Sequence, residues 1–261
     1  MEQRLDRSFQ TDAPAKPARP DAAPQAVPWR VDGLTELYER HAELYDRAFD
    51  WDIDEEVDWL LGRLGPDCRS VLEPGCGSGR VLAALARRGV EAMGIDRSPA
   101  MVELASARGL EVVRGDMTDF DLGCSFGGAL CPINTLAHLS PDELGRHLER
   151  MGAHLRPGAR YLVQLQLGGE AHTSKWEANG LRVVWATEHV DLAAGRQRQR
   201  SRIELASGEV VEEVHEMTLW TPETWAAAVA ASAFVQTAVY DGAEDGYPGG
   251  RPGSEGAMLW N

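Results

Sequence analysis

The chain has 261 residues, of which 43% are hydrophobic, and a formal net charge of −15 at pH 7. This length suits one domain with an insertion or a small cap, and the charge argues against nucleic acid as a partner, because a phosphate backbone requires a basic face. No apolar run reaches the roughly 18 residues of a membrane span, and no secretory signal is visible, so we expect a cytoplasmic protein without membrane contact. The four cysteines lack disulfide or metal-ligand spacing, so we expect neither disulfides nor a metal site.

The chain begins with residues 1–32, rich in proline, alanine and charge, which we expect to form a disordered tail. Two helical stretches are expected next, near 34–49 and 55–64. Strands then alternate with helices: we expect strands at 70–73, 92–95, 111–114, 127–130 and 159–165, and helices at 80–88, 99–107 and 141–155. This alternation predicts a parallel sheet with helices on both faces and a ligand site at the carboxyl edge of its strands.

The segment that joins the first strand to its helix carries the strongest functional signal. It reads E-P-G-C-G-S-G over residues 73–79, an acidic residue followed by glycines at alternate positions. Glycines permit a sharp turn and remove the Cβ atoms that would keep a ligand away from the backbone. A dinucleotide fingerprint has the spacing G-x-G-x-x-G and binds a pyrophosphate. The Glu73 carboxylate would repel a pyrophosphate, but it suits a ligand with an ammonium group, such as S-adenosylmethionine.

This motif resembles the first motif of the class I S-adenosylmethionine-dependent methyltransferases, usually written E/D-x-G-x-G-x-G, which residues 73–79 match in full. The resemblance covers about residues 34–240. It implies an α/β fold with a Rossmann-like, mostly parallel sheet of seven strands, helices on both faces, and an antiparallel β lid inserted after the fifth strand. It also implies S-adenosylmethionine as the cofactor, with Gly75, Cys76 and Gly77 beneath its methionine and ribose portions.

Two acidic residues follow the next two strands. Asp96 lies 21 residues beyond the first glycine, from where its carboxylate can bind both ribose hydroxyls; the alternative is that it only stabilises the start of the following helix. We expect Arg97 and Met101, which come next, to flank the adenine. The resemblance implies that Asp116 and the Met117 amide also bind the adenine, the alternative for Asp116 being an Asx-turn that closes its loop.

The loop after the fourth strand, residues 130–139, holds the acceptor side of the site in similar enzymes. It contains Pro132, which we expect at the cofactor, and Asn134 and His138, the polar residues expected nearest to the methyl group. His138 is the candidate to hydrogen-bond or deprotonate the acceptor, the alternative being a cap on the local backbone. Related small-molecule methyltransferases use a tyrosine from an N-terminal helix to cover the methionine carboxylate, and Tyr45 is our candidate for that role. We assign catalytic roles to His138, Asn134 and Tyr45.

The alternation of strands and helices stops after residue 167. Strands are expected at 181–190, 196–205 and 209–219, a helix at 222–231, and two short strands at 234–240 and 257–260. We therefore assign residues 33–167 to the cofactor-binding core, 168–220 to the lid and 221–261 to the remainder of the core.

Arginines occupy alternate positions in the second lid strand. A turn at Ser207-Gly208 would place Arg202 opposite Glu213 and Arg200 opposite His215. This pattern favours a cross-strand charge ladder over an anion site.

These observations predict a methyltransferase that modifies a nitrogen or oxygen of a small molecule by in-line transfer, in natural-product biosynthesis. Carbon methylation of an aromatic acceptor such as an indole remains an alternative. Two alternatives of other classes are a non-catalytic nucleoside-binding protein and an NAD-dependent oxidoreductase. The lid is also expected to offer a contact for a homodimer.

Overall fold

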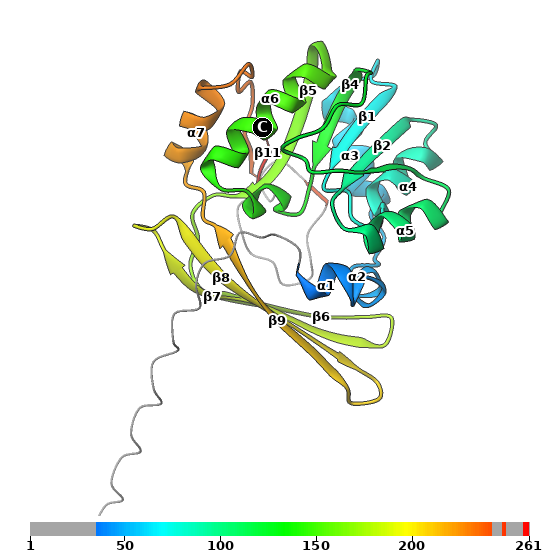
Figure 1. Ribbon diagram of the computed structural model, residues 1–261, viewed down its shortest axis with the longest axis vertical. Helices are drawn as coiled ribbons and strands as arrows, with labels where there is room; N and C mark the ends of the chain where they lie inside the picture. The colour runs from blue at the N-terminus through cyan, green and yellow to red at the C-terminus, as the bar shows by residue number, and fades with distance from the viewer. Residues whose placement is uncertain (1–34, 242–246, 249–257, 261) are drawn as a thin grey trace, which may run out of the picture.

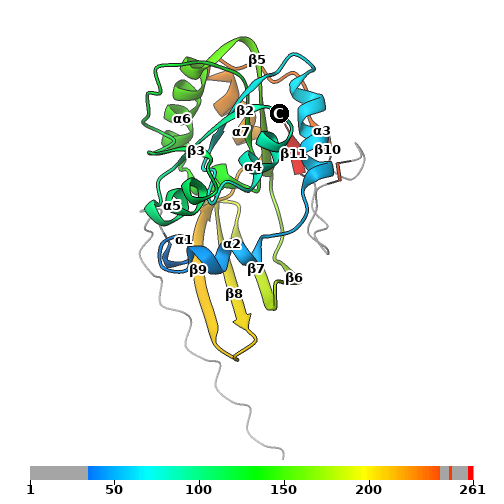
Figure 2. The same cartoon turned by 90° about the vertical axis from the view of Figure 1, so that its right-hand side faces the viewer.

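The computed structural model describes residues 35–241, 247–248 and 258–260, so the predicted tail at 1–32 lies outside the described residues. An α/β core carries an antiparallel sheet, the lid, at one end, and two short N-terminal helices lie between core and lid (Figures 1 and 2). None of the helices within these ranges combines the length and the apolar character needed to span a bilayer.

The core sheet has seven strands in the order β10-β11-β5-β4-β1-β2-β3. Five of them run parallel, namely β1 (Ser70–Pro74), β2 (Glu91–Asp96), β3 (Glu111–Arg114), β4 (Phe126–Cys131) and β5 (Leu155–Gln166). β11 (Met258–Trp260) pairs antiparallel with β5, and β10 (Tyr240–Asp241) pairs antiparallel with β11. The predicted Rossmann-like α/β fold is thus confirmed, with five of the seven strands forming the parallel part.

Helices cover both faces of this sheet because successive strand residues point to opposite sides. Val71 of β1 packs in one cluster with α3 (Asp54–Leu64) and α4 (Arg80–Arg87). The next residue, Leu72, packs in another cluster with α6 (Pro141–His154) and α7 (Pro222–Ala230). α5 (Pro99–Ala107) contacts β3 at the edge of the sheet.

The strand predicted at 234–240 is wrong for most of its length, since only Tyr240–Asp241 pairs with a neighbour. The residues before it run outside the sheet, and Val235 is 81% exposed. Phe234 packs instead against the core cluster of α6 and α7, with its ring 5.8 Å from that of Tyr161.

The lid is a four-stranded antiparallel meander of β6 (His172–Ala178), β7 (Leu181–Asp191), β8 (Arg196–Leu205) and β9 (Val210–Thr218). The sequence analysis did not predict β6. The expected helix at 34–49 is divided into α1 (Glu36–Glu39) and α2 (Ala42–Ala48). α2 lies against β6 and β7, so these helices join the lid to the core.

The register of β8 and β9 differs by one residue from the predicted one. Arg202 lies opposite Glu212 rather than Glu213. The connection is a three-residue loop, 206–208, in which Gly208 has a left-handed backbone (φ +88°). A three-residue hairpin with glycine in this conformation shifts the pairing relative to the two-residue turn that we predicted.

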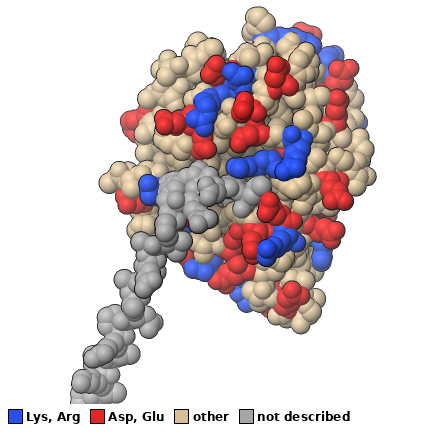
Figure 3. All heavy atoms as spheres, in the orientation of Figure 1, with Lys and Arg blue, Asp and Glu red and all other residues tan. Residues whose placement is uncertain are grey.

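This shift changes the face on which one lid residue lies. His215 pairs with Gln199 and not with Arg200, so it belongs to the inner face of the lid. On the outer face, Arg198 and Arg200 form ion pairs of 2.5–2.6 Å with glutamates of β7 and β9. Acidic and basic groups lie next to one another over the lid in Figure 3. The predicted charge ladder is therefore confirmed, although its register was wrong.

Candidate active site

A cavity lies between the carboxyl ends of β1, β2 and β4 and the helices α1 and α2. Twelve of the predicted site residues line it: Tyr45, Glu73, Gly75, Cys76, Gly77, Asp96, Arg97, Met101, Asp116, Met117, Pro132 and His138. Their position at one cavity is a structural finding, whereas the role of each residue remains a proposal. In the described part of the chain, no group of three or more His, Cys, Asp or Glu side chains is arranged to hold a metal ion.

The glycine turn that forms the floor of the cavity is left-handed at each glycine. At Gly77 (φ +55°) an added Cβ would meet no atom within 4 Å, so the backbone is open to a ligand there. At Gly75 (φ +67°) it would collide with the methyl group of Thr135. The prediction that bare backbone makes room for a ligand thus fits Gly77, while Gly75 lets the turn pack against the loop after β4.

Two buried polar atoms of residues on the cavity wall have no hydrogen-bond partner among the described residues. One is Oε2 of Glu73, a residue that is only 3% exposed. The other is Nη1 of Arg80, whose guanidinium lies 4.5 Å from the centre of the Trp51 ring. Burial raises the pKa of Glu73 to about 8 in spite of the nearby Arg80. Unpartnered buried groups are rare in folded proteins, and this acidic and basic pair fits the ammonium and carboxylate of an amino acid.

Arg80 is not among the residues predicted from the sequence. An arginine at the first position of a helix follows no distinctive pattern, and only the structure shows that its side chain reaches the cavity.

Asp96 joins the glycine turn to the start of α5. Its Oδ2 accepts from the Gly77 N–H at 2.8 Å, and its Oδ1 accepts from the Ser98 N–H at 2.9 Å. Asp96 therefore stabilises the start of α5, as the alternative predicted, and it also lines the cavity. A carboxylate offers about four lone pairs, so two hydrogen bonds leave acceptors for ligand hydroxyls.

A buried imidazole fixes the loop after β3 from within the core. Nδ1 of His147, a residue with no exposed surface, lies 2.9 Å from the Met117 carbonyl, and its Nε2 lies 2.8 Å from the Tyr161 hydroxyl. Burial lowers the pKa of His147 to about 4, so the ring is neutral. We assign the tautomer that donates to Met117 and accepts from Tyr161, because a carbonyl can only accept. Asp116 forms the Asx-turn that we considered, since its Oδ1 accepts from the Thr118 N–H and hydroxyl, each at 2.8 Å.

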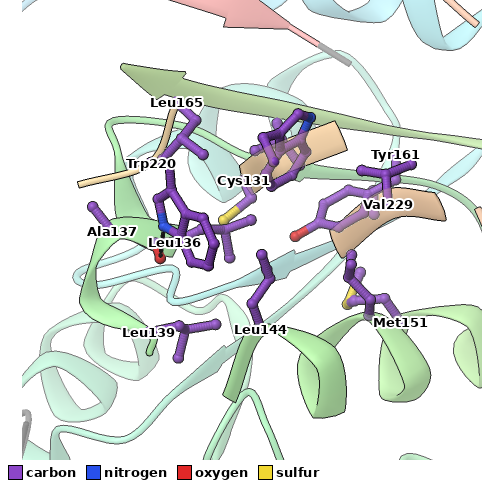
Figure 4. Close-up of a cluster of buried hydrophobic side chains, with 14 of the residues drawn as sticks. Cys131, Leu136, Ala137, Leu139, Leu144, Met151, Tyr161, Leu165, Trp220 and Val229 are labelled. Carbon is purple, nitrogen blue, oxygen red and sulfur yellow. Dashed lines mark hydrogen bonds between the residues drawn. The ribbon is translucent and has the colours of Figure 1, made fainter. Parts of the chain in front are cut away.

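The loop after β4 contradicts one predicted catalytic residue. Asn134 does not line the cavity, because its Oδ1 accepts from the Gln166 N–H at 2.5 Å. Its backbone is left-handed (φ 59°), as is that of Ile133 (φ 57°), and this turn directs the amide toward β5. Trp220 donates to the Leu136 carbonyl at 3.3 Å and anchors the same loop to the core cluster shown in Figure 4. Asn134 therefore shapes the loop, and we withdraw its catalytic role.

His138 ends the short 3-10 helix η1 (Thr135–His138) and lies on the cavity wall. Its ring packs edge-on against Tyr38, with 5.8 Å between centroids, and Tyr38 lies 5.0 Å from Tyr45 in the same way. Loss of water and the positive charge of Arg97 lower the pKa of His138 to about 4. Tyr45 is the tyrosine predicted from the sequence, yet Tyr38 also lines the cavity and packs against His138.

Helix α2 is tied to the glycine turn by charged and polar groups. The Asp46 carboxylate accepts from the Ser78 hydroxyl and from the Arg108 guanidinium at 2.5 Å. Arg108 also donates to the Ser78 carbonyl at 2.7 Å. These bonds hold the helix that carries Tyr45 over the cavity.

Comparisons with known proteins agree with this architecture. A family model described as a methyltransferase domain matches residues 71–158. The chain is 31% identical over 185 residues to a dTDP-3-amino-3,6-dideoxy-alpha-D-glucopyranose N,N-dimethyltransferase of Streptomyces fradiae, in a match that covers 66% of this chain and 72% of that protein. It is 29% identical over 213 residues to a dTDP-4-amino-2,3,4,6-tetradeoxy-D-glucose N,N-dimethyltransferase of Saccharopolyspora spinosa, covering 72% of this chain and 83% of that protein.

A similar solved structure is that of CalS10 with bound SAM, an amino pentose methyltransferase of Micromonospora echinaspora involved in calicheamicin biosynthesis. The TM-score is 0.65 at 25% identity, and the match covers 84% of this chain and 94% of that one.

Proposed function

Because this chain belongs to the class I S-adenosylmethionine-dependent methyltransferases, we propose that it methylates the amino nitrogen of a small, hydroxyl-bearing acceptor of the amino-sugar class. The relatives named above support this acceptor, since each of their names gives an amino sugar. The observation that carries the proposal is the position of the His138 imidazole on the wall of the same cavity as the residues that fit the cofactor.

The cavity wall offers a partner for each part of the cofactor. We assign Glu73 to the ammonium, Arg80 to the carboxylate and Asp96 to the ribose hydroxyls, and Asp116 with the Met117 amide to the adenine. We expect further contacts from Tyr45, Gly75, Cys76, Gly77, Arg97, Met101 and Pro132, which line the same cavity.

Methyl transfer to an amine requires a neutral nitrogen and a close approach. The cofactor supplies a methyl group that its sulfonium makes electrophilic. The protein aligns the acceptor, which can supply much of the acceleration, and His138 is placed to take the proton that the nitrogen loses. A neutral imidazole suits this place because a second positive charge would repel the sulfonium. Tyr38 and Tyr45 cover the cavity and exclude water from it.

Asp96→Ala should weaken the binding of S-adenosylmethionine by about 1–3 kcal/mol, because it removes charged acceptors from a buried site. Titration calorimetry measures this change. Glu103→Ala, which removes an exposed carboxylate from the same helix α5, is the matched control and should leave the affinity unchanged. If both variants bind the cofactor like the wild type, Asp96 does not belong to the site.

The proposed function is tested with three acceptors, of which two differ only in the group that would accept the methyl. The full chain is incubated with S-adenosylmethionine and either an amino sugar, the same sugar with a hydroxyl in place of the amine, or an indole. We expect S-adenosylhomocysteine and methylated product with the amino sugar alone. Turnover that favours the hydroxyl analogue or the indole would replace nitrogen by oxygen or carbon as the acceptor atom.

We further propose that the enzyme is cytoplasmic and that two copies associate through the lid. Val210 and Val214 are 40% and 42% exposed on β9, on the outer face with the charge ladder, and such a contact would cover them. Sedimentation of the wild type and of Val214→Glu tests the association, which the new charge should abolish.

A further inference from the structure

The inner face of the lid has an apolar half and a polar half. In the apolar half, Trp176, Leu181 and Ile203 pack against residues of α2 and its neighbours, including Leu44 and Phe49. In the polar half, Thr187 of β7, Gln199 of β8 and His215 of β9 lie directly opposite one another. Ser201 of β8 belongs to the next row of paired residues. The buried polar residues of these rows are Thr187, Gln199, Ser201 and His215, each 1–6% exposed.

Such a buried polar face is costly unless its groups are hydrogen-bonded, and here the bonding is incomplete. The Trp185 indole N–H donates to Oε1 of the Gln199 side chain at 2.9 Å. The Gln199 amide is 3.5 Å from the Thr187 hydroxyl, and the Ser201 hydroxyl is 3.4 Å from Nε2 of His215, both long for hydrogen bonds. Nδ1 of His215 is buried and has no partner within the described ranges.

The polar half lies behind Tyr38, next to the catalytic end of the cavity, and none of its four residues lines the cavity itself. The His215 ring stacks on Trp185, with 5.4 Å between centroids and 17° between planes, which fixes its orientation. Tyr38 lies between the two imidazoles, 6.0 Å from His215 and 5.8 Å from His138. β9 also contacts η1, the element that carries His138.

The neighbouring row ties the same region to helix α1. Glu213 accepts from the N–H groups of Glu36 and Leu37 at 2.9 and 2.8 Å. The lid therefore positions the helix that carries Tyr38, and the inner face of β9 is held in a defined place beside the cavity.

We propose that the ring of Tyr38 moves aside when the acceptor enters and that His215, with Ser201 and Gln199, then binds the hydroxyl groups of the acceptor across from His138. The ligand class is a polyhydroxylated ring amine, because imidazole, hydroxyl and amide groups all exchange hydrogen bonds with hydroxyls. This inference rests on the proposed function and names the residues that select its substrate. Burial and the neighbouring His138 lower the pKa of His215 to about 4, so its ring is neutral and can donate from one nitrogen while it accepts at the other.

The first test replaces His215 by phenylalanine, which keeps the aromatic stack on Trp185 but cannot form hydrogen bonds. With the full chain, KM for an amino-sugar acceptor should rise about tenfold, as expected for losing one or two buried hydrogen bonds. The Kd of S-adenosylmethionine should stay the same. His189→Phe, at an exposed position of β7, is the control and should leave both constants unchanged. An unchanged KM in a folded His215→Phe protein would overturn the inference.

The second test separates a binding role from a structural one. KM is measured for the acceptor and for analogues that each lack one hydroxyl. The wild type should lose affinity for at least one analogue, and His215→Phe should no longer distinguish that analogue from the parent. His215→Asn, which retains a donor and an acceptor, should restore part of the discrimination. If the variants discriminate as well as the wild type, His215 does not contact the acceptor. Absence of wild-type turnover with any amino sugar would instead contradict the proposed function.

Discussion

Replacing Glu73 by glutamine should make the ligand-free protein more stable at pH 7–8 and weaken its binding of S-adenosylmethionine about 10- to 100-fold. Burial raises the folded-state pKa of Glu73 from 4.5 to about 8. Its contribution to stability is therefore fully present below pH 4.5 and is lost as the pH rises toward 8. At pH 7 this loss amounts to about 2–4 kcal/mol, which a neutral glutamine of the same shape avoids.

The cofactor should make the charged form of Glu73 favourable, because its ammonium group is the partner that the buried carboxylate lacks. A hydrogen bond to a charged group contributes about 1.5–3 kcal/mol, which sets the expected loss of affinity in Glu73→Gln. Thermal unfolding between pH 5 and 8 should show a stability difference between variant and wild type that grows with pH. A variant that is less stable than the wild type throughout, with undiminished affinity, would show that Glu73 is a structural residue.

Glu73 also predicts a proton release on binding. At pH 6.5 the side chain of the ligand-free protein is largely protonated, and the cofactor's ammonium should convert it to a carboxylate. Calorimetric titrations in buffers of different ionisation enthalpy should therefore report about one proton released per complex. Glu73→Gln should release none.

His138→Ala should lower kcat about 100-fold and leave the affinity for S-adenosylmethionine within about a factor of two. General acid–base groups typically contribute this much or more, and His138 lies at the cavity wall, where we assign it no part in holding the cofactor's charged ends. Because its pKa is lowered to about 4, it is neutral throughout the range from pH 6 to 8. The rate of the wild type should therefore show no loss from protonation of His138 in this range.

A glutamine at position 138 separates proton transfer from positioning. Glutamine can hydrogen-bond an amine but cannot remove its proton at neutral pH. We expect His138→Gln to remain about as slow as His138→Ala in single-turnover measurements with preformed cofactor complex. Recovery of most of the rate by glutamine would make His138 a positioning residue, and full activity of His138→Ala would make it a structural one.

Sequence reasoning located the cofactor side of the site well, because the signals there are local. The glycines and the acids of residues 73–116 each occupy a strand end, and parallel strands bring such ends together whatever the details of packing. Gly77 and Asp96 therefore meet at the cavity as predicted, joined by a hydrogen bond of 2.8 Å. Helix caps are equally local, and the hydroxyls of Ser98 and Ser140 cap α5 and α6.

The acceptor side was predicted less well, because it depends on backbone details that span distant segments. The left-handed conformation at Ile133 and Asn134 turns the amide of Asn134 away from the cavity, and no pattern in the loop indicates this. A single extra loop residue before Glu209 moves His215 to the inner face of the lid. Tyr38 is held at the site by distant segments, since Glu213 of the lid and Ser98 of the core both bind the backbone of α1.

A crystal structure with S-adenosylhomocysteine tests the central claim most directly. We expect its amino group within hydrogen-bond distance of Glu73, its carboxylate at Arg80 and its ribose at Asp96, with the sulfur facing His138 and Tyr38. A complex in which the ligand binds elsewhere, or with its amino-acid end directed toward Asp116, would contradict the account.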